Sequence, residues 1–118
     1  MTEVHDSDIA TEFPEGWVIV NKREAQQLEN ELRNELHSSH ILYGRAVTAM
    51  AQYMPTKGKD VLFKVESASY FYYRVHLTWS KERTAEYPSV DGYNSISEFV
   101  RGWAGVIAYW NSEGAEAN

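Results

Sequence analysis

Histidine side chains are the first groups in this sequence that could do chemistry. His37 and His40 lie three residues apart, and His76 lies far downstream. Three imidazoles can bind zinc, but no H-E-x-x-H pattern accompanies them and the chain has no cysteine to supply a thiolate. The sequence therefore predicts no metal site and no cofactor, with His37 capping a helix end and His40 making an ordinary polar contact.

His76 is the candidate for acid–base chemistry. On a predicted strand beside Tyr72 and Arg74, it could act as a general base with Asp60 or Asp91 as its partner. No G-x-S-x-G nucleophile elbow is present, and no pair of carboxylates has a recognisable setting. A strand histidine that bonds a neighbouring side chain is the commoner situation. The sequence therefore favours a protein that is not an enzyme.

The stretch YFYYRVHLTWS, residues 70–80, is predicted to form a strand with two unlike faces. Side chains of a strand point alternately to opposite sides, which divides its residues into two sets. The large apolar set is expected to face the core: Phe71, Tyr73, Val75, Leu77 and Trp79. The set that can form hydrogen bonds is expected to be solvated or to face a partner: Tyr70, Tyr72, Arg74, His76 and Thr78.

Two helices must support this strand. Apolar residues at three- and four-residue steps predict the first, which begins after Asn21 as N-cap with Glu24 three residues later. Ser95 and Glu98 form an S-x-x-E capping box that predicts the start of the second. Pro and Asp-Gly in residues 80–94 predict a loop before it.

The segments between the helices predict an antiparallel sheet. Residues 41–54 have features of both helix and strand and are interpreted as a strand, whereas 61–67 alternate clearly. Residues 13–20 are an edge strand or an extended lead-in. The predicted fold is α+β, in the order helix-β-β-β-helix: a small antiparallel sheet of three to four strands with two helices packed on one face.

Charge is unevenly distributed along the 118 residues. The net charge is −6, and the excess of acidic residues lies at the two ends. Residues 1–12 are predicted to be a disordered acidic tail, 13–111 a single domain and 112–118 a second disordered tail. This balance argues against nucleic-acid binding, whose affinity comes mainly from basic side chains.

Location follows from what the sequence lacks. It begins without a basic, apolar leader, and no apolar run approaches the ~18 residues of a membrane span. The absence of cysteine fits a reducing compartment. We predict a cytoplasmic protein with no membrane partner.

The segments GKDVLFKV, YYRVHLTWS and EYPSVDGYNSISEFV resemble a set of small bacterial proteins of unknown function with a DVLF…VHLTW…P pattern. The resemblance covers about residues 17–100. It marks His76, Thr78, Trp79 and Pro88 as pattern positions and implies no catalytic role for them. The chain departs from the pattern at residues 58–60, Gly-Lys-Asp, where a paired acid is more usual. This departure argues against a role that needs two carboxylates there.

Aromatic content gives the functional hypothesis. Eight tyrosines and four tryptophans exceed what a core of this size needs, and both residue types are enriched at binding hot spots. We predict a non-catalytic bacterial protein-interaction domain, such as an immunity protein that neutralises a toxin. Its partner would be a toxin or another bacterial protein. The predicted interaction residues are Tyr70, Tyr72, Arg74, His76, Thr78, Tyr87 and Tyr93.

Two alternatives stay open at this point. One is a small-molecule-binding domain or weak hydrolase centred on His76. The other is a self-associating module that forms a homodimer through an exposed strand edge or its tyrosine-bearing face.

Overall fold

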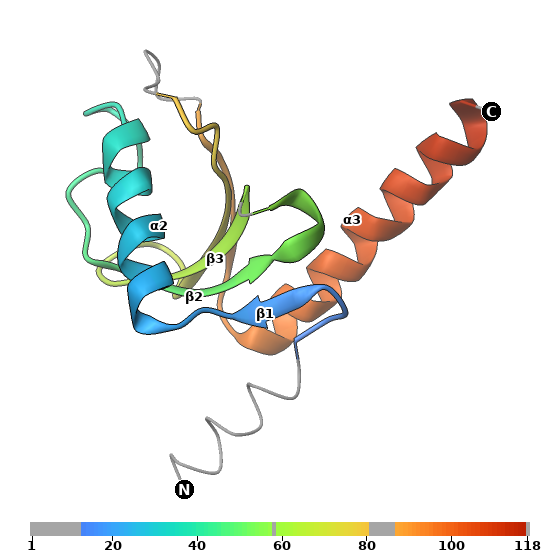
Figure 1. Ribbon diagram of the computed structural model, residues 1–118, viewed down its shortest axis with the longest axis horizontal. Coiled ribbons are helices and arrows are strands. Elements are labelled where there is room, and N and C mark those ends of the chain that lie inside the picture. Colours follow the sequence, from blue (N-terminus) through green and yellow to red (C-terminus); the bar gives the residue numbers. More distant parts are fainter. Residues whose placement is uncertain (1–12, 58, 81–86, 118) are drawn as a thin grey trace, which may run out of the picture.

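The computed structural model describes residues 13–57, 59–80 and 87–117 (Figure 1). The helices are α2 (Lys22–Glu35) and α3 (Ile96–Ala117), with a short 3-10 helix η1 (Met54–Thr56). The strands are β1 (Trp17–Ile19), β2 (Val47–Tyr53), β3 (Asp60–Val65), β4 (Tyr72–His76) and β5 (Ser89–Tyr93). The predicted α+β class is confirmed. Residues 1–12 lie outside the described residues, and α3 continues through residues 112–117, so the predicted tails stay predictions.

The strands of the described residues form one antiparallel meander in the order β1-β2-β3-β4-β5. The expected number of three to four strands was too low, because β1 and β5 complete a five-stranded sheet. β5 lies within the segment predicted as a loop. It joins the sheet through its backbone, pairing Val90 with Val75 and Gly92 with Tyr73. Of the segment 41–54, only Val47–Tyr53 is a strand, and turns precede it.

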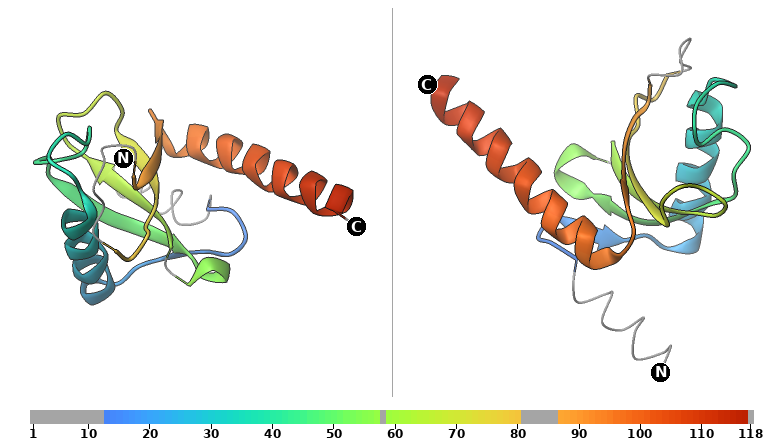
Figure 2. Two further views of the ribbon diagram at one scale, coloured as in Figure 1. Left: turned by 90° about the horizontal axis from the view of Figure 1, so that it is seen from above. Right: turned by 180° about the vertical axis from the view of Figure 1, so that it is seen from behind.

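The two helices cover opposite faces of the sheet (Figures 1 and 2). The prediction that both pack on one face is therefore wrong. The physical reason lies in β3, where Val61 and Phe63 face α2 while Leu62 faces α3, and all three are fully buried. A sheet that is apolar on both faces needs a layer on each side.

The α2 side holds the larger core. Its buried residues come from α2, the turn after it and the middle strands: Leu28, Leu32, Leu36, Leu42, Val47, Ala49, Val61, Phe63, Val65, Tyr73, Val75 and Leu77. The predicted capping box at its start is confirmed, since Asn21 Oδ1 accepts from Glu24 N at 2.8 Å and Glu24 Oε1 accepts from Asn21 N at 2.9 Å.

The α3 side holds a smaller, aromatic core of Trp17, Ala51, Leu62, Ile96, Phe99 and Trp103. The ring of Trp17 makes edge contacts with Phe99 and Trp103, at centroid distances of 5.0 Å and 5.2 Å. The Ser95 cap is confirmed, because Ser95 Oγ accepts from Glu98 N at 3.1 Å; the Glu98 carboxylate accepts from Asn94 N, one residue earlier than expected.

The stretch 70–80 is strand only in its middle. Tyr73, Val75 and Leu77 are buried as predicted. Phe71 and Trp79 are 63% and 49% exposed, so their predicted place in the core is wrong. Both lie outside β4, and Trp79 has a φ of +58°, which ends the alternation on which that prediction depended.

Candidate functional site

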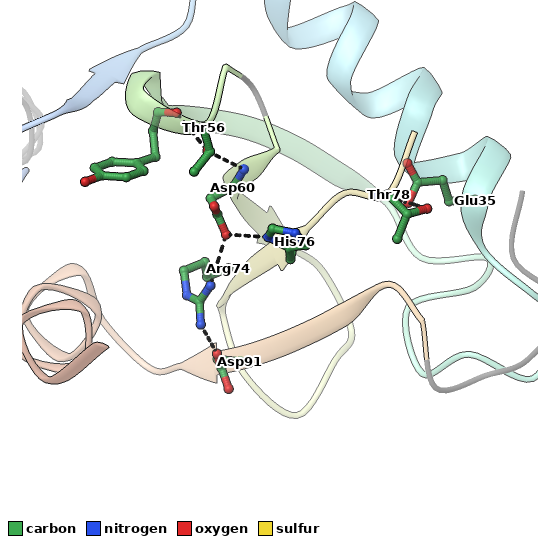
Figure 3. Close-up of polar contacts among 8 residues, drawn as sticks. Glu35, Thr56, Asp60, Arg74, His76, Thr78 and Asp91 are labelled. Carbon is green, nitrogen blue, oxygen red and sulfur yellow. Dashed lines mark hydrogen bonds and ion pairs between the residues drawn. The ribbon is translucent and has the colours of Figure 1, made fainter. Parts of the chain in front are cut away.

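A polar cluster lies on the α3 side of the sheet, across three neighbouring strands (Figure 3). Asp60 is the first residue of β3 and pairs with His76, the last residue of β4. Arg74 pairs with Asp91 of β5. The strand registers therefore bring together four polar side chains that are separated by up to 31 positions in the chain.

Asp60 is the centre of this cluster. Its side chain is only 1% exposed, and its Oδ1 accepts hydrogen bonds from Arg74 Nη1 at 3.2 Å and from His76 Nδ1 at 3.0 Å. Arg74 Nη2 donates to Asp91 Oδ2, and the guanidinium lies 5.6 Å from the centre of the Trp103 ring. A buried carboxylate needs such partners because an unpaired charge is costly away from water. Asp60, and not Asp91, is therefore the carboxylate that orients His76.

His76 is the chemically available member. Asp60 occupies its Nδ1, which fixes the orientation of the ring and the site of one ring proton. The ring borders a surface depression of about 480 Å³ that is also lined by Pro55, Thr56, Lys57, Lys59 and Trp79. Thr56 is the hydroxyl-bearing residue of this lining, and its Oγ1 accepts from Asp60 N and donates to Tyr53 O. Among the described residues that line it, the depression thus offers charges for binding but no activated nucleophile.

The seven predicted interaction residues do not form one surface. Tyr72 and Tyr93 pack against the start of α3, and the Arg74 side chain is mostly buried; only His76 remains open on that side. The other three lie elsewhere: Tyr70 packs against Tyr73 on the α2 side, Thr78 bonds α2, and Tyr87 is exposed before β5.

Glu35 is a buried carboxylate that the sequence analysis did not select. It is fully buried at the end of α2, where it lies beside Thr78 (Figure 3) and accepts from Thr78 N at 2.8 Å and Thr78 Oγ1 at 3.0 Å. It also accepts from Trp79 N at 2.6 Å. It therefore anchors the turn after β4 to α2. The signal was available, because Glu35 is three residues beyond Leu32 and so lies on the apolar stripe of the helix.

Glu31, one turn before Glu35, makes stability depend on pH. Burial, the hydrogen bond to Glu35 and the negative charge of Glu35, in that order, raise the pKa of Glu31 from 4.5 to about 7. Between these two values the folded chain holds a proton that the unfolded chain has released, so stability falls as the pH rises from 4.5 to 7.

We expect Glu31→Gln to stabilise the protein above pH 7 by about 1–3 kcal/mol and to have little effect below pH 4.5. Urea unfolding at pH 4.5, 6 and 8 measures the difference. Glu66→Gln, the same change at an exposed position, is the matched control. An equal effect of Glu31→Gln at all three pH values would contradict the prediction.

His37 and His40 have structural roles. His40 is buried; its Nδ1 accepts from Leu42 N at 3.1 Å, so its Nε2 donates to Pro88 O at 2.9 Å. The predicted polar contact of His40 is confirmed. His37 Nδ1 accepts from Ser39 N in the turn that follows α2. In the described part of the chain, no three His, Asp or Glu side chains are grouped in a way that could hold a metal.

A second candidate site runs along α3, which extends away from the sheet beyond its first turns (Figures 1 and 2). A groove of about 520 Å³ lies between α3 and the turn before β1, lined by Pro14, Glu15, Gly16, Tyr53, Pro55, Trp103, Ala104 and Ile107. Further along the helix, Tyr109 is 62% exposed and Trp110 is 41% exposed. We call the groove together with Tyr109 and Trp110 the α3 surface.

No family model, curated protein or solved structure matches this chain. The resemblance to small bacterial proteins therefore stays a prediction, as does the status of Thr78, Trp79 and Pro88 as pattern positions. Among the described residues, no helix combines the length and the apolar character that crossing a membrane requires.

Proposed function

We propose that this chain is a non-catalytic protein-interaction domain and that the α3 surface is its contact surface. The observation that carries the proposal is the segment 102–111 of α3, GWAGVIAYWN, which contains no charged residue. Most of its residues are exposed or only partly buried. A helix that is apolar on all sides is normally covered by other protein, because leaving it in water forfeits the hydrophobic free energy of burial.

The residue types on the α3 surface support a protein as its occupant. Trp110 and Tyr109 are exposed aromatic residues, the class that most often dominates binding energy at interfaces. Among the described residues that line the groove, Glu15 is the only charged one, so an apolar partner would enter it without leaving several charges unpaired.

The occupant that fits these properties is a second copy of the chain. The apolar helix that the groove would accept is present on the same molecule, directly beyond the groove, as the segment from Ile107 to Trp110. Two copies of α3 that cross antiparallel at Ile107 place Trp110 of each copy beside Ala104 of the other, because both positions are three residues from the crossing point. In this two-fold symmetric dimer, α3 of each copy fills the groove of the other.

Small residues allow this approach. Gly105 has nothing within 4 Å of the position that a Cβ would occupy, and Ala104 and Ala108 are exposed. Two helices whose contact positions are small can come close, at the short end of the ~8–10 Å range of packed helices. This helix pair would cover the uncharged segment and hold the aromatic rings against protein.

Analytical ultracentrifugation over a concentration series tests the proposal. We expect the wild-type chain to form dimers with a dissociation constant in the micromolar range, and Ile107→Glu to be monomeric. Trp110→Ala should weaken the dimer by at least ~30-fold if Trp110 is a hot spot. Ile41→Glu places the same charge at an exposed apolar position on the opposite side of the chain and should leave the dimer intact. A wild-type chain that remains monomeric at millimolar concentration would refute the proposed occupant.

A bacterial immunity protein that neutralises a toxin is one kind of protein-interaction domain, and that more specific function is also a proposal. A dimer through α3 leaves Tyr70, Phe71 and Tyr87 exposed for a different protein.

A further inference from the structure

Positive charge gathers at the depression beside His76, away from α3. Lys57 and Lys59 line it and are both exposed, and none of the described residues that line it is acidic. The ion pairs recorded among the described residues join Arg74 and His76 to Asp60 and Asp91, and they leave both lysines available. Lysine ammonium groups commonly hold phosphate as point charges. The depression therefore suits a small anion.

An aromatic wall borders the same depression. Trp79 is half exposed there. Its backbone N donates to the buried carboxylate of Glu35 at 2.6 Å, which ties this residue to α2. The half-exposed indole offers a flat surface on which a planar ring can stack.

The backbone around the depression is held in an uncommon conformation. Of the described residues other than glycine, three have positive φ values: Lys57 at +57°, Ser67 at +63° and Trp79 at +58°. Two of these three, Lys57 and Trp79, line the depression. Side chains of this size rarely adopt such φ values, and residues that do so are concentrated at binding sites.

We infer that this depression binds a small molecule in which an aromatic ring carries a phosphate group, as in a nucleoside monophosphate. Lys57 and Lys59 would hold the phosphate, Trp79 would stack on the ring, and His76, oriented by Asp60, would donate or accept one hydrogen bond through Nε2. A volume of about 480 Å³ lies within the usual range of small-ligand sites, ~300–1,000 Å³. This binding site does not depend on the protein interaction proposed for α3.

Isothermal titration calorimetry with adenosine 5′-monophosphate tests the inference, with adenosine and inorganic phosphate as the two partial probes. We expect the nucleotide to bind with a dissociation constant below ~1 mM and at least ~10-fold more tightly than either partial probe. The Lys57→Met/Lys59→Met double variant should weaken nucleotide binding by ~10-fold or more, because it removes both phosphate contacts.

Two further variants make the test decisive. Trp79→Leu should weaken binding of the nucleotide but not of inorganic phosphate, since only the ring contact is lost. Lys64→Met, at an exposed lysine that lines a different depression, is the matched control and should bind like the wild-type chain. No heat of binding at millimolar nucleotide, or equal binding in the Lys57/Lys59 double variant, would overturn the inference. If inorganic phosphate bound as tightly as the nucleotide, the inference that Trp79 stacks on a ring of the ligand would be overturned.

Discussion

Replacing Glu35 by alanine is expected to lower the free energy of unfolding by about 3 kcal/mol. The carboxylate accepts three hydrogen bonds in a fully buried position, two of them from the backbone N–H groups of Thr78 and Trp79. Without Glu35 these two N–H groups lose their partner, and a buried donor without an acceptor costs more than the bond itself contributes. Relief of the repulsion with Glu31 offsets a part of the loss.

Urea unfolding at pH 8, where Glu31 and Glu35 repel most, measures this change. Thr78→Val is the control, because it removes the hydroxyl contact but leaves both backbone bonds; we expect it to cost about 1 kcal/mol. The tryptophan emission of the chain, to which Trp79 contributes, should shift in Glu35→Ala and not in Thr78→Val, since only the former releases the Trp79 backbone. If Glu35→Ala unfolds within ~0.5 kcal/mol of the wild-type chain, the anchoring role is wrong.

The second large effect on stability is expected at one of two phenylalanines, of which one is buried and the other exposed. Phe99→Ala is expected to destabilise the protein by about 3–5 kcal/mol, because the ring is fully buried and a cavity replaces it. Its contacts with Phe13, Trp17 and Tyr93 join α3 to β1 and β5. Since an ordinary domain is stable by only ~5–15 kcal/mol, this variant should be unfolded to a measurable extent at 37 °C.

Phe71→Ala is the matched control, with the same chemical change at an exposed ring. We expect it to change the free energy of unfolding by less than ~0.5 kcal/mol. Thermal unfolding followed by circular dichroism compares the two variants at one protein concentration. A comparable loss in both would show that Phe71 has a structural role that its exposure does not indicate.

Local patterns predicted local structure in this chain. Asn21 and Glu24 cap α2 as expected, and Ser95 caps α3, because capping depends on residues within one turn of each other. Tyr73, Val75 and Leu77 face the core as their alternation indicates. The same alternation wrongly predicts that Phe71 and Trp79 are buried, since no sequence pattern marks the residue at which the strand ends.

β5 was missed for a related reason. Asp91 and Gly92 are typical of turns, yet they belong to an edge strand. Gly92 is explained by its neighbour: a Cβ there would lie 2.3 Å from the ring of Tyr70, which packs over it. That contact joins a residue of β5 to one in the bend before β4, and it leaves no trace in the local sequence.

Some features of the candidate sites can likewise be predicted from local sequence, and others cannot. The sequence by itself marked His76 as the candidate for acid–base chemistry and placed the start of α3 directly after Ser95. Only the tertiary structure decided that Asp60 orients His76, that Glu35 holds Trp79, and that α3 covers the face opposite α2. Each of these depends on strand register or on a buried charge that finds its partner at a distance in the chain, and such pairings are set by packing and desolvation rather than by spacing.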